Sequence, residues 1–117
     1  MLRRLFGRKP RDIGELDGLV IAQLRKAGAD LRLPRDTIHY LYFPTQEGAE
    51  VAAGRLSAEG LTAEAKPAAA GDLPWRVIAN HDYVVNDETI RAIRAVAEDA
   101  ARAGGGEYDG WEAAAVP

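Results

Sequence analysis

Residues 36–43 (DTIHYLYF) combine β-branched and aromatic side chains and end at Pro44, a pattern typical of a β-strand. In a strand, successive side chains point to opposite faces, and both faces here carry bulky groups. One face would hold Ile38, Tyr40 and Tyr42, and the other Thr37, His39, Leu41 and Phe43. We therefore expect a strand that is central in its sheet and covered on each side.

Three amphipathic segments predict helices. The first is expected over 12–28, where Asp12 and Glu15 form a capping-box pattern, and the second over 45–60, where a stripe of small residues suits close packing on a sheet. The third is expected over 86–104. Its polar face, predicted to point to water, includes Arg91, Arg94, Glu98 and Arg102.

Three further segments predict strands at 61–66, 75–85 and 107–113, the last following a run of three glycines that should end the third helix. The order after residue 35 is then βαββαβ. The predicted fold class is α+β, a ferredoxin-like sandwich with a four-stranded antiparallel sheet and an extra N-terminal helix. That extra helix could cover part of the second face of the sheet.

A chain of 117 residues with 47% hydrophobic and 28% charged residues is typical of one globular domain. We expect a basic flexible leader at 1–11 and a single domain at 12–117. No apolar run approaches the roughly 20 residues of a membrane-spanning helix. The basic start lacks the apolar segment and cleavage site of a signal peptide, and the chain has no cysteine, so a cytoplasmic location is expected.

The charge is distributed unevenly along the chain. Arg3, Arg4, Arg8 and Lys9 lie among the first ten residues without an acid, whereas residues 11–117 hold 11 basic and 18 acidic residues, a net charge of −7. An acidic body repels nucleic acid and attracts basic partners, so nucleic-acid or membrane-surface binding would depend on the basic N-terminus.

The sequence contains none of the common catalytic signatures, and no enzyme activity or cofactor is expected. Three weaker patterns have structural interpretations that we favour. The glycine run before Glu107 could form an anion-binding nest, the acids Glu107, Asp109 and Glu112 could hold a hard cation, and His39 and His81 could approach each other in the sheet. None of the three predicts a complete site.

Tyr108 and Trp111 are three residues apart, so a regular strand places them on opposite faces. We expect one ring in the main core and the other on the second face, against the first helix or a partner. The residues expected to contact a partner are Glu107, Tyr108, Asp109, Gly110, Trp111, His39 and Tyr40.

The segments DLRLPRDTIHYLYFP, WRVIANHDYVV and GGEYDGWE, with the spaced small residues between the first two, resemble the regulator of ribonuclease activity B family. The resemblance covers most of residues 12–114, and EYDGW is its most specific element. It implies a ferredoxin-like α/β sandwich and a protein inhibitor that binds ribonuclease E rather than RNA. Two features differ from the best-known members: the N-terminus is basic, and their long acidic C-terminal tail is absent.

The prediction is therefore a protein-binding regulator, an inhibitor or modulator of a ribonuclease E-type endoribonuclease, which is a monomer or weak homo-oligomer. The alternative is a nucleic-acid or membrane-surface binding module that uses residues 1–9. A third class, a small-ligand or metal-dependent enzyme, has the least support in the sequence.

Overall fold

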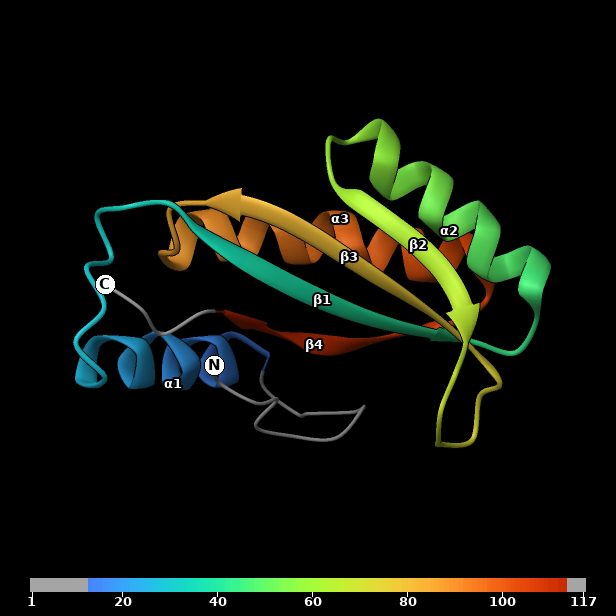
Figure 1. Cartoon of the computed structure of the whole chain (residues 1–117), viewed down its shortest axis with the longest axis horizontal. Coiled ribbons are helices and arrows are strands. Elements are labelled where there is room, and N and C mark those ends of the chain that lie inside the picture. Colours follow the sequence, from blue (N-terminus) through green and yellow to red (C-terminus); the bar gives the residue numbers. More distant parts are fainter. Residues whose placement is uncertain (1–12, 114–117) are drawn as a thin grey trace.

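The computed structural model describes residues 13–113, which form three helices and four strands (Figure 1). In chain order these are α1 (Ile13–Lys26), β1 (Arg35–Phe43), α2 (Gln46–Ala58), β2 (Thr62–Pro67), β3 (Trp75–Tyr83), α3 (Asp87–Gly104) and β4 (Glu107–Ala113).

The four strands form one sheet in the order β2-β3-β1-β4, and every neighbouring pair is antiparallel. This mixed α+β fold has the predicted order of elements and is consistent with a ferredoxin-like arrangement. β1 is central, as its two bulky faces indicated. β3 ends at Tyr83, two residues before the predicted end, because the chain turns there toward α3.

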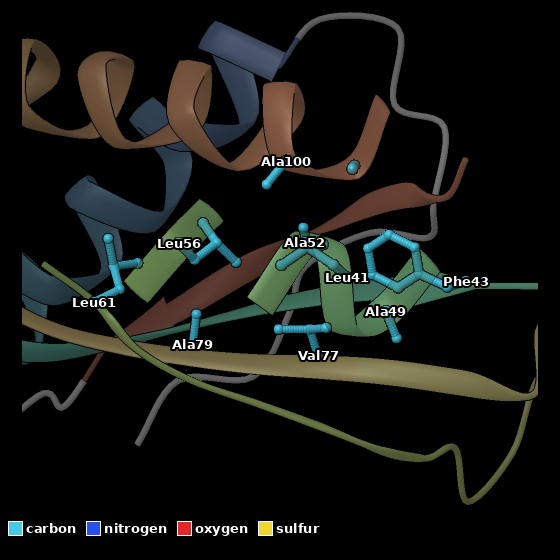
Figure 2. Close-up of a cluster of buried hydrophobic side chains, with 10 residues drawn as sticks. Leu41, Phe43, Ala49, Ala52, Leu56, Leu61, Val77, Ala79 and Ala100 are labelled. Carbon is cyan, nitrogen blue, oxygen red and sulfur yellow. The ribbon is translucent and has the colours of Figure 1, made fainter. Parts of the chain in front are cut away.

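Helices α2 and α3 cover one face of the sheet and enclose the larger hydrophobic core (Figure 2). Leu41 and Phe43 of β1 and Val77 of β3 point into this core, because side chains of one parity face the helices. The small residues of α2 include Ala49 and Ala52, which are fully buried and let the helix approach the strands, as predicted.

The start of α2 and the end of α3 touch through their backbones. A Cβ atom added to Gly48 would lie 2.1 Å from the carbonyl oxygen of Gly104, and one added to Gly104 would lie 2.2 Å from that of Gly48. Both distances are far below van der Waals contact, so this crossing requires glycine in both helices.

Strand β4 contains a β-bulge at Asp109. Tyr40 of β1 pairs with Gly110, whereas the next residue, Leu41, pairs with Tyr108, so Asp109 is the extra residue. Gly110 has a φ of 116°, a conformation that glycine adopts without a steric penalty. The bulge therefore shifts the side-chain alternation of β4 by one residue.

The bulge places both aromatic rings of β4 on the helix side of the sheet. Tyr108 pairs with Leu41 and Trp111 pairs with His39, and directly paired residues share a face. The prediction that Tyr108 and Trp111 lie on opposite faces is therefore wrong, because it assumed an unbroken alternation that the extra residue interrupts.

Helix α1 lies beside β4 (Figure 1). Its contacts with α3 and with Trp111 place it on the same side of the sheet as α3. Its apolar side chains join a second core with Trp111 and the start of α3; this core consists of Val20, Ile21, Leu24, Val85, Ile90, Trp111 and Ala113. The expectation that this helix could cover the second face is wrong, because Trp111, the side chain on which it packs, lies on the helix side. Among residues 13–113, no helix covers the other face of β1.

No helix among the described residues is long and apolar enough to span a membrane. The predicted leader at 1–11 lies outside the described residues, and its boundary stays a prediction.

Two substitutions in α2 test the backbone contact between α2 and α3. Gly48→Ala should lower the free energy of unfolding by about 1–3 kcal/mol, because the new methyl group has no room beside Gly104. Gly54→Ala in the same helix has no atom within 4 Å of the added carbon and should instead raise it by about 0.5–1 kcal/mol. Urea unfolding measures both, and effects of the same sign would contradict the contact.

Candidate interaction surface

The structure separates the seven predicted contact residues into two groups. The helix side holds His39, Tyr108 and Trp111, the opposite face holds Tyr40, Glu107 and Gly110, and Asp109 forms the bulge between them. The first group is covered by the helices. Only the second group lies on a face that no described helix covers, and within it Tyr40 and Glu107 are half-buried whereas Gly110 is buried.

His39 lies at the centre of a buried polar network. Its Nε2 atom lies 3.2 Å from Thr37 Oγ1, and its Nδ1 atom lies 3.0 Å from the hydroxyl of Tyr108. Because the Thr37 hydroxyl donates to the carbonyl oxygen of His81 at 2.9 Å, it must accept from His39. This assigns a neutral His39 protonated at Nε2, with the Tyr108 hydroxyl donating to Nδ1.

Burial keeps the groups of this network uncharged. It lowers the pKa of His39 to about 3, and the charge of His81 acts in the same direction. Burial also raises the pKa of Tyr83 to about 12 and that of Tyr108 well above its ordinary value. The rings of Tyr83 and Tyr108 stack on His39 with centroids 6.4 and 6.1 Å away. The network thus acts as a neutral structural link between β1, β3 and β4.

A buried carboxylate joins α1 to the rest of the molecule. Asp17 accepts a 2.9 Å hydrogen bond from the indole Nε1 of Trp111 and an ion-paired hydrogen bond from Arg94 of α3. Burial raises the pKa of Asp17, whereas the hydrogen bond from Trp111 and the charge of Arg94 oppose that rise. Both partners therefore favour the ionised carboxylate, which accepts their hydrogen bonds.

The prediction that Arg94 faces water is wrong. Its side chain is 17% exposed, because α1 covers the part of α3 that helical spacing marks as polar. Sequence reasoning did not identify Asp17 as a functional group either. The available signal was an acid inside an apolar helical stripe, at the third position before Val20.

The described residues contain no group of three or more side chains able to hold a metal ion. His39 and His81 both lie on the helix side, on neighbouring strands, with Thr37 opposite His81. Because His39 is already engaged by Thr37 and Tyr108, it makes structural contacts rather than forming half of a ligand pair.

The second face of the sheet, here called the helix-free face, has apolar side chains at its centre and mainly acidic side chains around them. The strand register gathers Ile38, Tyr40, Tyr42 and Ile78 at the centre, all half-buried. The charged residues around them are Asp36, Glu64, Asp82, Glu107 and Glu112, with Lys66 and Arg76 as the bases. Glu112 is buried and accepts a hydrogen bond from the Tyr40 hydroxyl. Half-buried aromatic and aliphatic side chains at the centre with charged residues around them resemble the core and polar rim of a protein–protein interface.

The pKa of His39 gives a pH dependence of stability with a defined sign. An unfolded histidine takes up a proton near pH 6.5, whereas His39 in the folded protein does so only near pH 3. Stability from this residue is therefore complete above pH 6.5 and falls by about 1.4 kcal/mol per pH unit as the pH drops toward 3. Urea unfolding between pH 7 and about 5 should show a shallower loss for His39→Gln than for the control His81→Gln. Equal slopes would contradict the buried neutral state.

Comparison with individual curated proteins gives no match. The family model described as regulator of ribonuclease activity B matches residues 15–113, which span all four strands and nearly the whole of α1. This match includes the EYDGW segment that forms the bulged strand β4. The family regulates ribonuclease activity and is not a catalytic one. The chain therefore belongs to the regulator of ribonuclease activity B family.

Proposed function

We propose that this chain inhibits a ribonuclease E-type endoribonuclease by direct protein–protein contact and so controls RNA decay. The observation that carries the proposal is the acidic, partly aromatic face of a chain whose family regulates ribonucleases. Ribonucleases that bind RNA carry basic segments, and an acidic surface attracts such segments over a distance of about one Debye length.

Within the predicted contact set, the two sides of the sheet have different roles in this proposal. Tyr40 and Glu107, which are half-buried, contact the ribonuclease, whereas Asp109 and Gly110, which are buried, shape the bulged strand beside them. His39, Tyr108 and Trp111 act from the helix side, where their hydrogen bonds fix the strand that carries the contact residues.

The alternative is binding of RNA or a membrane surface through Arg3, Arg4, Arg8 and Lys9. The net charge of −7 over residues 11–117 disfavours it, because phosphates would be repelled by the rest of the chain. We further propose a cytoplasmic, cofactor-independent protein that is a monomer or weak homo-oligomer.

An RNA-cleavage assay with the purified endoribonuclease of the source organism tests the proposal. Adding the chain should lower the cleavage rate to a plateau, and raising the salt concentration from about 50 to 200 mM should weaken the inhibition several-fold through screening. A variant lacking residues 1–9 should inhibit equally well, since the contact lies on the folded domain.

The same titration is repeated with labelled RNA alone in a mobility-shift assay. Inhibition that disappears with excess RNA substrate, together with a shift of RNA by the chain, would contradict direct contact and indicate substrate sequestration. An unrelated ribonuclease on the same RNA is the specificity control.

A further inference from the structure

The helix-free face presents its side chains in a regular array along β1. Asp36, Ile38, Tyr40 and Tyr42 follow one another on this face at the spacing of alternate strand residues, about 6.6 Å each. An extended peptide has the same spacing between its own alternate side chains. A segment lying along β1 can therefore place every second side chain over one residue of this row.

The acids of this face lie at both ends of the apolar row. At one end Asp36 pairs directly with Asp82 across β1 and β3, and both side chains are exposed. Like charges in a directly opposed pair destabilise a sheet unless a cation lies between them. At the other end Glu107 lies opposite Tyr42.

The aspartate pair also borders a hollow. Its volume is about 360 Å³, and it is lined by Asp36, Gly60, Thr62, Asn80, His81 and Asp82. Two carboxylates and an amide at its wall provide acceptors for a donor-rich cation. On the neighbouring edge strand, Lys66 is already paired with Glu64 at 2.9 Å, so it does not offset the charge of the aspartates.

We propose that the helix-free face binds an extended, arginine-rich segment of the partner ribonuclease that runs along β1. One guanidinium lies between Asp36 and Asp82, and others stack over Tyr40 and Tyr42 toward Glu107. This inference rests on the proposed function for the identity of the partner, but the chemistry of the ligand follows from the face itself.

Arginine fits these groups better than lysine does. The planar guanidinium pairs with two acceptors at once and stacks on aromatic rings, whereas an ammonium is a compact and strongly hydrated charge. The half-buried tyrosine pair offers ring surface and the exposed aspartate pair offers paired oxygens. Both contacts favour the same side chain.

The test measures binding of a short fluorescent peptide, in which arginine alternates with serine, to the full chain by anisotropy. The wild-type chain should bind it more tightly than the matched lysine peptide. Tyr42→Ser should weaken binding roughly tenfold. Glu64→Gln, an exposed acid on β2, should weaken it less, whereas the control Glu50→Gln on the helix side should leave it unchanged.

Asp82→Asn separates binding from folding. Removing one of two opposed carboxylates should raise the thermal midpoint of the free chain while weakening peptide binding several-fold. A purely structural residue would move stability and binding in the same direction. Circular dichroism of each variant confirms that the fold is retained.

Equal affinity of the wild type, Tyr42→Ser and Asp82→Asn for the arginine peptide would overturn the proposal. Equal binding of the arginine and lysine peptides would overturn the stacking contact. Self-association detected by sedimentation, with no peptide binding, would assign the face to a second copy of the chain instead.

If the variants lose the peptide but still inhibit the ribonuclease, the proposed function stands and this surface assignment fails. If the wild-type chain binds the peptide but inhibits no ribonuclease, the surface assignment stands and the proposed function fails.

Discussion

The β-bulge of β4 is the constraint on which the position of α1 beside α3 depends. One extra residue, Asp109, moves Trp111 to the same side as Tyr108. The indole then donates to Asp17, and α1 docks beside α3 instead of behind the sheet. Without the extra residue, Trp111 would point away from α3, and α1 would lose both its largest apolar contact and its hydrogen-bond donor.

Asp17 and His39 are both buried on the helix side, and each is satisfied in a different way. Burial raises the pKa of Asp17, and the donors that Arg94 and Trp111 supply oppose this rise by stabilising the carboxylate. His39 stays neutral because burial disfavours its charged form, and its ring nitrogens contact the hydroxyls of Thr37, Tyr108 and Tyr83. Unsatisfied polar groups in these positions would cost free energy. The His39 network therefore also specifies the register of β4 against β1, and the Asp17 network fixes α1 against α3 and β4.

The division between the two faces of the sheet supports a regulator that works by contact. The helix side uses its aromatic and polar groups for internal hydrogen bonds, as those of His39 and Trp111 show. The helix-free face combines half-buried tyrosines with exposed acids, and the register sets their spacing. Under the proposed function, stability and recognition reside on opposite sides of the same four strands, so a change to one face can leave the other intact.

The sequence by itself determined the elements and the family. The local patterns around DTIHYLYF, the small-residue stripe of α2 and the glycine run before β4 predict their structures through short-range propensities, and these predictions are confirmed. Because EYDGW lies in the matched region, the resemblance to the family was also visible in the sequence.

Only the tertiary structure decided the side on which Trp111 lies, the burial of Arg94 and the position of α1. A bulge depends on the pairing of two strands distant in the sequence, so the alternation of one strand cannot reveal it. Sequence reasoning likewise predicts that a polar helix face is exposed to water. That prediction fails where another element buries an oppositely charged side chain against the face. Asp17 is such a side chain, and it lies 77 residues away from Arg94 in the chain.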